Sequence, residues 1–538
     1  MLNEQGAKSQ RAIAEEIGIP RSTLQHWLAR RQGIDADPNL VAFFESEAGI
    51  AFLHRLILAA HFVITQLGPS GVRMVCLFME LSGLDQFVAA CYGTQRQVNQ
   101  EIEEAIIAYG EQERKRLSET ASPKAITICE DETFHPEICL VAIEPVSNFI
   151  VLEEYADDRK AQTWTAALQE SLVGLRVEVI QATSDEGRGI CRHIEHELGA
   201  HHSPDLFHVQ QAASQATSAP LAAQVRKAEA DLAKASQRVE AQQAHRQAYL
   251  ESNPRPVGRP PGFERRIATA QASAKEAQSN LEAALARQAQ AKTTIQAISQ
   301  SYHPYDLTTG AARSAEIVTE ELAAHFATLE TIADQASLST RCQEQICKAK
   351  RVVVKMVATI AFFFLTIQAK VEALSLTVKQ EQAVYNHLIP GIYLQMAADK
   401  APTAQERQAL RQQSQRLLAP LNCLESPLFM LEWEQKKLVE GVATECAQLF
   451  QRSSSCTEGR NGQLALRHHS LHRLSNRKLS ALTTVHNYFI TRPDGSTPAQ
   501  RFFNAEPLNL FDYLLAHIDL PGRPAKKRPP SPPQPVLI

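Results

Sequence analysis

The sequence predicts an α/β plus all-α protein, in which one domain with a mixed sheet is combined with long helical segments. Short apolar runs rich in β-branched residues follow one another between residues 124 and 182. Before and after that region apolar residues recur at helical spacing, and residues 209–450 are almost wholly helical in pattern. A chain of 538 residues is too long for one core, so we expect about three or four domains.

The composition is that of a helix-rich globular protein without a dominant charge. Hydrophobic residues make up 44% of the chain and charged residues 21%, and the formal net charge is −4. This balance gives no general attraction to nucleic acid, so any such contact must use local basic patches. The ten cysteines show no recurring Cys-x-x-Cys spacing, which argues against a zinc ribbon or a disulfide framework and indicates reduced thiols.

No segment predicts a membrane span or a secretory leader. The N-terminus is polar, and the most hydrophobic stretch, residues 356–369 between Lys355 and Lys370, is shorter than the roughly 20 apolar residues that a bilayer requires. We therefore expect a buried core helix at 356–369, a cytoplasmic protein and no membrane partner.

The N-terminal region, residues 1–36, carries the pattern of two short helices joined by a turn at Gly18. Apolar residues lie at helical spacing on both sides of that glycine, at Ile13, Ile17, Ile19, Leu24 and Leu28. The pattern is typical of a helix-turn-helix, whose second helix enters the major groove of DNA. The candidate groove contacts are then Arg21, Ser22, Thr23, Gln25 and His26. An ordinary helical hairpin is the alternative.

Residues 37–120 are predicted to be helical. A second helix-turn-helix is possible there, with Thr94, Gln95 and Arg96 opening its recognition helix. A plain helical bundle, such as a dimerisation surface, explains the same pattern equally well.

Residues 121–208 change to the period of strands. We expect strands at 125–129, 138–143, 149–155 and 177–182, a polar fifth strand at 201–205, and helices at 163–173 and 189–198. Five histidine and cysteine residues cluster in the last part of this region: Cys191, His193, His196, His201 and His202. They lack the spacing of a tetrahedral metal site, so we interpret them as solvated helix and loop positions.

Acidic residues stand where two of these strands end. Asp131 follows the first strand and Asp185 the fourth, and Glu458 precedes two glycines in what we expect to be the first turn of a helix. Carboxylate oxygens are the natural ligands of Mg²⁺ or Mn²⁺. Two such ions can activate a nucleophilic oxygen and stabilise the leaving oxygen of a phosphodiester. Nearby carboxylates remain alternatives: Glu130, Glu132, Asp157, Asp158 and Glu186.

Residues 209–450 are expected to form a helical insertion, from which residues 221–300 project as an antiparallel coiled-coil hairpin. Val225, Leu232 and Val239 are spaced by seven, and a second segment repeats this spacing after a Pro- and Gly-rich break at 253–262. Arms of about 30 residues would be roughly 45 Å long. Residues 451–518 would then complete the sheet domain, and residues 519–538 form a disordered basic, Pro-rich tail.

The order of these parts resembles that of a DDE-type bacterial insertion-sequence transposase, and the organisation is similar to hAT and Mutator-type transposases. Two short motifs add to the resemblance. Asp205-Leu-Phe-His208 matches the acidic-x-x-His motif that follows the second Asp in those families, and Glu458-Gly-Arg-Asn-Gly462 looks like their Glu-bearing signature. The resemblance covers nearly the whole chain and implies an RNase H-like catalytic domain.

The resemblance also implies a function. Asp131, Asp185 and Glu458 would hold two Mg²⁺ or Mn²⁺ ions, with Asp205 and His208 beside them. The enzyme would cleave and transfer DNA strands at the ends of an insertion sequence.

Its partners would be double-stranded DNA, both terminal inverted repeats and target, and a second copy of the chain, in the nucleoid of a prokaryote. Arg460, Arg467 and Arg473 near the glutamate would grip phosphates. Two alternatives remain open: a catalytically inactive, transposase-derived repressor, and a structural coiled-coil scaffold.

Overall fold

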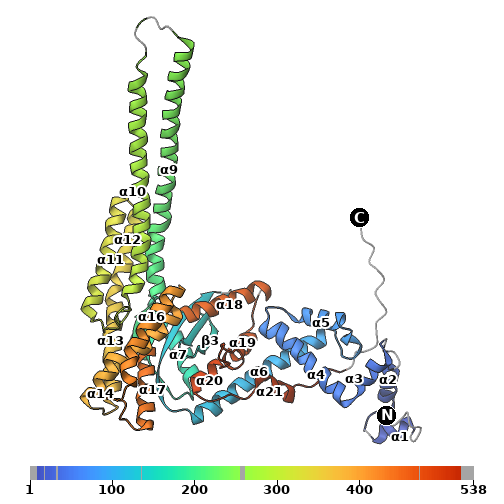
Figure 1. The fold of residues 1–538 in the computed structure, drawn as a ribbon. Helices are drawn as coiled ribbons and strands as arrows, with labels where there is room; N and C mark the ends of the chain where they lie inside the picture. The colour runs from blue at the N-terminus through green and yellow to red at the C-terminus, as the bar shows by residue number, and fades with distance from the viewer. Residues whose placement is uncertain are drawn as a thin grey trace.

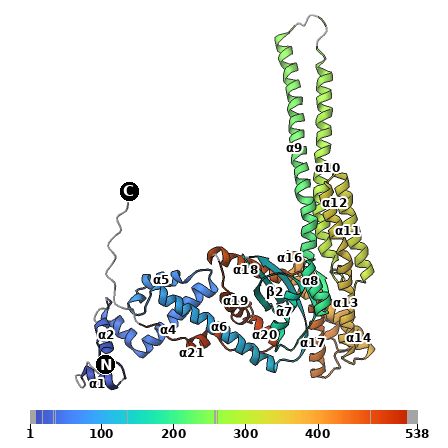
Figure 2. The same cartoon turned by 180° about the vertical axis from the view of Figure 1, so that it is seen from behind.

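The computed structural model describes residues 9–16, 18–31, 34, 36–134, 136–254, 258, 261–471 and 473–522. Figures 1 and 2 show a central sheet domain with N-terminal helices on one side and a helical insertion on the other. The two long helices α9 and α10 project from the insertion away from the sheet. The basic tail expected at 519–538 lies outside the described residues from position 523 onward.

One sheet of five strands forms the centre of the molecule, in the order β3-β2-β1-β4-β5. Strands β2 and β3 are antiparallel to their neighbours, whereas β4 and β5 run parallel to β1. The strands and the helices between them are β1 (Lys124–Phe134), β2 (Ile138–Glu144), β3 (Phe149–Ala156), α7 (Ala161–Leu172), β4 (Val177–Ser184), α8 (Arg188–Arg192), the π-helical turn η3 (His193–Leu198) and β5 (His201–Pro204). All five expected strands are therefore confirmed, including the polar fifth one.

The two faces of the sheet pack against different helices. Leu140 and Ala142 of β2 belong to the core that includes Trp164 of α7, whereas Val141 and Ile143 belong to the core that includes Leu464 of α18 (Ser455–Leu471). Successive residues of a strand point to opposite faces, so this alternation divides the acidic residues of β1 as well. The C-terminal helices are α18, α19 (Asn476–Tyr488), α20 (Pro498–Phe503) and α21 (Leu510–His517).

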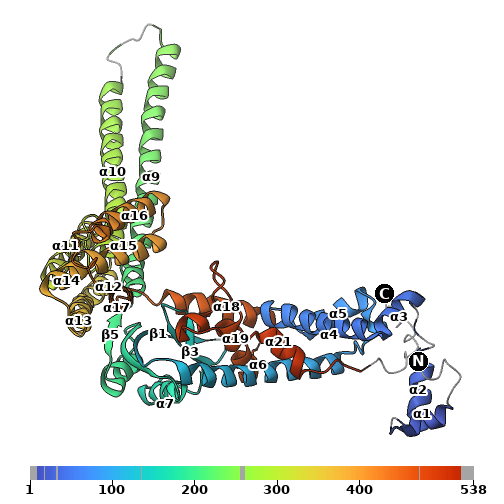
Figure 3. The ribbon, with the colours of Figure 1, turned by 60° about the horizontal axis from the view of Figure 1, so that its bottom comes forward.

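The N-terminal region consists of helices, and its longest helix runs along the sheet domain (Figure 3). Its elements are α1 (Gln10–Glu16), α2 (Arg21–Arg31), α3 (Pro38–Glu45), α4 (Glu47–His61), the π-helical turn η1 (Phe62–Leu67), α5 (Val72–Leu81), the 3-10 turn η2 (Leu84–Gln86) and α6 (Tyr92–Thr120). Gln95 is fully buried and accepts a 2.7 Å hydrogen bond from His61. A buried, bonded Gln95 cannot read a DNA groove, so the structure does not support a second helix-turn-helix at 94–96.

The chain leaves the sheet domain directly after β5 and returns beside the point where it left. The backbone N–H of Leu206 donates to the carbonyl of Arg452 over 2.9 Å, closing the base of the insertion. The helices in between are α9 (Leu206–Ser252), α10 (Phe263–Ser301), α11 (Ala315–Gln335), α12 (Thr340–Arg351), α13 (Val353–Glu372), α14 (Val378–Ala383), the π-helical turn η4 (Val384–Leu388), α15 (Ile389–Lys400), α16 (Ala404–Leu418), the 3-10 turn η5 (Ala419–Asn422) and α17 (Trp433–Leu449).

The apolar stretch 356–369 lies inside α13, which runs through the core of the insertion. Met356, Ile360 and Phe363 are each at most 1% exposed there. The predicted core helix is thus confirmed. By length and composition alone, two stretches of the described chain, Glu47–Leu67 and Thr340–Glu372, are apolar enough to cross a membrane.

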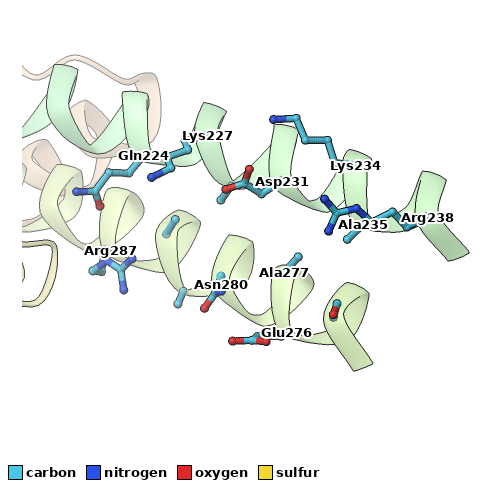
Figure 4. A pocket seen from close by; sticks show the side chains of 14 residues that line it. Gln224, Lys227, Asp231, Lys234, Ala235, Arg238, Glu276, Ala277, Asn280 and Arg287 are labelled. Carbon is cyan, nitrogen blue, oxygen red and sulfur yellow. The ribbon is translucent and has the colours of Figure 1, made fainter. Parts of the chain in front are cut away.

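The hairpin of α9 and α10 has longer arms and a thinner core than the heptad pattern suggested. The arms have 47 and 39 residues, or about 70 and 60 Å at 1.5 Å per residue. The first arm exceeds the expected 45 Å because α9 begins immediately after β5 rather than at the first heptad, and the second because α10 continues from Phe263 to Ser301. Along 221–300 small residues such as Ala235, Ala284 and Ala291 are buried, whereas Leu232 and Leu281 are only partly so. Polar side chains line a hollow of about 470 Å³ between the arms (Figure 4).

Candidate active site

Asp131 lies on the face of the sheet that α18 covers. It follows Cys129 and Glu130 in β1 and pairs with Val141 across the strand, on the same face. Its Oδ2 accepts a 2.8 Å hydrogen bond from the amide of Asn461 in α18, and its Oδ1 accepts one of 2.8 Å from its neighbour's N–H. The first turns of α18 therefore stand directly over Asp131.

Asp185 comes immediately after β4, which runs parallel to β1. Cys129 of β1 pairs with Thr183 of β4, and each aspartate follows two residues later, so the two carboxylates share one edge of the sheet. The Oδ1 of Asp185 accepts a 2.9 Å hydrogen bond from the N–H of Gly187, which holds the loop that begins α8.

Glu458 lies in the first turn of α18, as expected, and is exposed. Its backbone N–H donates to the carbonyl of Ser454 over 3.2 Å, and α18 packs against β1 and β2. The glutamate thus approaches the sheet from the same side as Asp131.

Asp131 has a raised pKa of about 7. Burial is the main cause, the carboxylates of Glu458 and Asp185 contribute to the rise, and the N–H of Glu132 and His208 oppose it. A carboxyl group whose neighbours are two other carboxylates holds its proton more tightly, because ionisation would place like charges together. Glu458, Asp185 and His208 thus lie close enough to Asp131 to influence its ionisation.

Asp205 joins the two ends of the insertion. It is 1% exposed, and its Oδ1 caps α9 by accepting a 2.7 Å hydrogen bond from the N–H of Phe207. Its Oδ2 accepts hydrogen bonds from the N–H (3.2 Å) and the hydroxyl group of Ser454, just before α18. His208 Nε2 lies 3.9 Å from the same oxygen. Asp205 therefore positions the helix that carries Glu458.

The alternative carboxylates of β1 face the opposite side of the sheet. Glu132 accepts a 3.1 Å hydrogen bond from the indole of Trp164 and pairs with Arg159 over 3.3 Å. Glu130 is fully buried, 3.4 Å from His193. Both belong with α7 and η3, not with Asp131.

Two of the three arginines expected near the glutamate hold the fold together. Arg460 is 5% exposed and forms two 2.6 Å hydrogen bonds with Glu153 of β3. Arg467 donates to the backbone carbonyls of residues 66, 67 and 68, which closes the end of η1. Arg460 and Arg467 are therefore not free to bind phosphates, because internal acceptors take up their donors. Arg473 is exposed and pairs with Glu137.

Most of the N-terminal candidates for DNA contact lie on the surface. Arg21, Ser22 and Gln25 are exposed, Thr23 is partly buried, and the side chain of His26 lies outside the described residues. Leu24 packs with Ile13 and Ala14, and Gly18 makes the turn with a φ of +68°. The expected pair of helices is present.

Two members of the histidine and cysteine cluster are not solvated, which corrects the interpretation from sequence. His193 is fully buried and His202 is 4% exposed. One ligand atom from each of Glu186, Cys191 and His202 lies within 4.8 Å of the other two, so these three could hold a metal ion. No spacing rule revealed this group, because β5 brings His202 to the loop after β4.

Asn461 was also missed by the sequence analysis as a site residue. It stands three positions after Glu458 in the signature Glu-Gly-Arg-Asn-Gly, and this helical spacing placed it on the same face as the glutamate.

An all-oxygen set of three carboxylates suits Mg²⁺ or Mn²⁺ better than softer ions. The raised pKa of Asp131, which is due mainly to burial, fits such a role, because a divalent cation would offset the cost of ionising this buried carboxyl group. Their ligand atoms are spread more widely than those of Glu186, Cys191 and His202.

Comparison with known proteins adds one match. Residues 384–530 match DUF6399, a family of unknown function. This segment runs from the last third of the insertion through α18 to the C-terminal helices, so it includes Glu458 but neither aspartate. No curated protein matches the chain.

Proposed function

We propose that the protein is a DDE-type transposase with an RNase H-like catalytic domain, which cleaves and transfers DNA strands at the ends of an insertion sequence. The observation that carries this proposal is the placement of Asp131 and Asp185 at one edge of two parallel neighbouring strands. The helix α18, whose Asn461 donates a hydrogen bond to Asp131, carries Glu458 in its first turn, more than 270 residues after Asp185.

Asp131, Asp185 and Glu458 would hold two Mg²⁺ or Mn²⁺ ions. Such ions, when bound, lower the pKa of an attacking water and stabilise the leaving 3′-oxygen of a phosphodiester. The chain's own residues position the carboxylates: Asn461 holds Asp131, and Asp205 holds the start of α18.

DNA binding is assigned to two surfaces. The exposed residues Arg21, Ser22 and Gln25 at the start of α2 would read the terminal repeat in a helix-turn-helix arrangement. The hairpin region 221–300 carries 12 Lys and Arg and seven Asp and Glu, a net charge of +5 in a chain whose total is −4. Such a local excess of positive charge favours contact with the DNA backbone.

Two transposon ends must be held together for transfer, so we propose that the active form is a dimer or a larger assembly in the nucleoid. The catalytically inactive repressor remains the competing function. It shares the DNA-binding surfaces and differs only in the chemistry.

The deciding experiment compares cleavage and binding on one duplex. The terminal repeat would be taken from the DNA that flanks the coding sequence. Asp185→Asn preserves size but removes a charge from the metal ligands, so we expect metal-dependent cleavage to fall by at least 10²-fold, a loss of about 2.7 kcal/mol of transition-state stabilisation. Repeat binding in a gel shift should persist. Wild-type protein that binds the repeat but never cleaves it with Mg²⁺ or Mn²⁺ would favour the repressor.

A further inference from the structure

A second group of potential metal ligands lies behind the loop that carries Asp185. Glu186 stands in the loop after β4, Cys191 in α8 and His202 in β5. The Cys191 Sγ and His202 Nδ1 atoms are 4.0 Å apart, and His202 Nδ1 is 3.9 Å from Glu186 Oε1. Tetrahedral zinc with its usual bond lengths separates sulfur and nitrogen ligands by about 3.5 Å. The distances from His202 to Cys191 and to Glu186 would each have to shorten by about half an ångström to reach this geometry, and all three ligand atoms already lie within 4.8 Å of one another.

The hydrogen bonds of His202 orient it as a ligand. The Ser184 hydroxyl group donates to the carbonyl of Asp185 over 3.0 Å, and so its oxygen is free to accept from His202 Nε2, also at 3.0 Å. This arrangement puts the imidazole proton on Nε2 and leaves the lone pair of Nδ1 available, 3.9 Å from Glu186 Oε1. The Cys191 sulfur lies almost equally far from both ring nitrogens, 4.0 Å from Nδ1 and 3.9 Å from Nε2. Metal-binding histidines commonly donate their second ring N–H to an oxygen in this way.

A cation already occupies the neighbourhood of these three ligands. The ammonium group of Lys355, from α13 of the insertion, lies 3.1 Å from Glu186 Oε2, 3.4 Å from His202 Nδ1 and 3.9 Å from Cys191 Sγ. Glu195 Oε1 is 3.4 Å from the same ammonium group and 3.8 Å from His202 Nδ1. Glu186, Cys191 and His202 thus surround a positive charge, and the carboxylate of Glu195 is close enough to serve as a fourth ligand.

We propose that Glu186, Cys191 and His202 form a binding site for a zinc-like divalent ion, separate from the carboxylate site, and that the ion competes with Lys355 for these ligands. Thiolate and imidazole select Zn²⁺ or Co²⁺ over Mg²⁺, so the two sites differ in the metal they take. Binding would replace a contact of α13 with the Asp185 loop by a metal ion. Zinc binding would thereby change how the insertion packs against β4 and β5, because Lys355 of α13 would lose its contacts with Glu186 and His202.

Cobalt titration of the full-length protein tests this directly, because cobalt bound to a thiolate absorbs in the near ultraviolet and tetrahedral cobalt absorbs strongly in the visible. Millimolar Mg²⁺ would be present throughout to fill sites made of carboxylates alone. We expect one equivalent of Co²⁺ to give both absorptions and one equivalent of Zn²⁺ to abolish them.

Variants assign the ligands and the competitor. Cys191→Ser should remove the near-ultraviolet band, and Glu186→Gln, whose side chain is 33% exposed and therefore tolerant, should weaken Co²⁺ binding at least tenfold. Lys355→Met should strengthen binding about tenfold or more, because it removes the competing ammonium group. The matched controls are Cys347→Ser and Lys348→Met on α12, outside the group.

Absence of the thiolate band, its survival in Cys191→Ser, or equal affinity in wild type and Lys355→Met would each overturn the proposal. Circular dichroism would establish that each variant is folded. The assay contains no DNA, so its outcome is independent of transposition.

Discussion

Arg460 and Glu153 form an ion pair that is almost completely enclosed between α18 and β3. Both guanidinium–carboxylate hydrogen bonds measure 2.6 Å, and Thr483 donates a further hydrogen bond to Glu153. A buried pair of this kind adds little compared with an apolar pair, but removing one partner leaves a buried charge without compensation. Arg460 therefore matters for the seating of α18, and through it for Glu458.

Replacing Arg460 by Met should lower the free energy of unfolding by about 3–5 kcal/mol, because Glu153 is left charged and buried. The double change Arg460→Met with Glu153→Leu should recover most of this loss. Urea denaturation measures both. The control Arg473→Met, at an exposed pair, should cost at most about 1 kcal/mol. If the Arg460→Met protein were as stable as wild type but bound DNA more weakly, the result would support the phosphate contact that the sequence predicts for Arg460.

Asp131 makes the protein's stability depend on pH. Burial, Glu458 and Asp185 raise its pKa in the folded protein to about 7, from an ordinary value near 3.8. The folded state thus binds the proton more tightly than the unfolded state. The stabilisation is complete below pH 3.8 and is lost as pH rises toward 7.

Asp131→Asn, which imitates the protonated carboxyl, should therefore become more stable than wild type as pH rises. Without divalent ions we expect a difference of roughly 1–3 kcal/mol at pH 8 and much less near pH 4, since each pKa unit corresponds to about 1.4 kcal/mol. Denaturation in a chelating buffer at several pH values measures it. Mg²⁺ should stabilise wild type at pH 8 but not the variant. A difference independent of pH, or one shared by the exposed control Asp512→Asn, would contradict this account.

The hairpin of α9 and α10 has a thin core along its length. Alanines supply much of its buried surface, and Lys227, Lys234, Arg238 and Arg287 line the hollow between its arms together with Asp231 and Glu276 (Figure 4). Thin apolar packing with an excess of cations is a suitable surface for a polyanion.

Replacing Lys234 and Arg238 by Gln should weaken DNA binding and reduce its dependence on salt, if both residues contact phosphates. The slope of log K against log salt concentration should then fall by about 1.8, or about 0.9 for each lost contact with duplex DNA. Fluorescence anisotropy at several salt concentrations measures this slope. Gln at Lys436 and Lys437 of α17 provides a control of equal charge in the same insertion. An unchanged slope would leave the hairpin without a role in DNA binding.

At the scale of the whole molecule, helices α1 and α2 lie at the far end of the N-terminal region from the sheet domain (Figure 1). Helices α1 and α2 have a small core of their own around Ile13 and Leu24, whereas the C-terminal segment returns to the N-terminal helices α3–α6. His54 Nε2 is 2.6 Å from the carbonyl oxygen of Ile518, and Ala89 N–H donates to the carbonyl of Gly522. Residues 518–522 therefore pack against α4 and the segment before α6, and helices α1 and α2 precede this body in the chain.

Arg21→Ala combined with Gln25→Ala should abolish preference for the terminal repeat without affecting the fold. Base contacts typically supply about 1–3 kcal/mol each, so the two changes should cost roughly 30- to 10⁴-fold in discrimination. Competition gel shifts with repeat and scrambled duplexes measure the ratio, and Glu15→Gln on α1 serves as the control. Full discrimination in the double variant would place sequence reading elsewhere in the chain.

Local patterns along the chain were sufficient to predict the five strands, the core helix at 356–369, the two-helix form of the hairpin, and the places of Asp185 after its strand and Glu458 in the first turn of its helix. They ended the first strand too early, because β1 continues to Phe134 and Asp131 therefore lies within it. They succeed because the period of a strand or helix is set by backbone geometry within a few residues. The alternation along β1 also separates Asp131 from Glu130 and Glu132, but only the helices packed on each face show which side carries the site.

Partners distant in the chain could not be predicted in this way. Arg460 bonds to Glu153, and Asp205 to Ser454, although the members of each pair are more than 200 residues apart in the chain. His202 lies beside Cys191 and Lys355 only because β5 and α13 pack next to α8. Whether a cation is exposed or enclosed depends on the carboxylate that folding brings to it, since a charge can be buried only beside a compensating partner. The spacing of residues along the chain does not predict such contacts. Only the tertiary structure therefore shows that Arg460 is enclosed by Glu153 and that Asp131 is buried beneath α18.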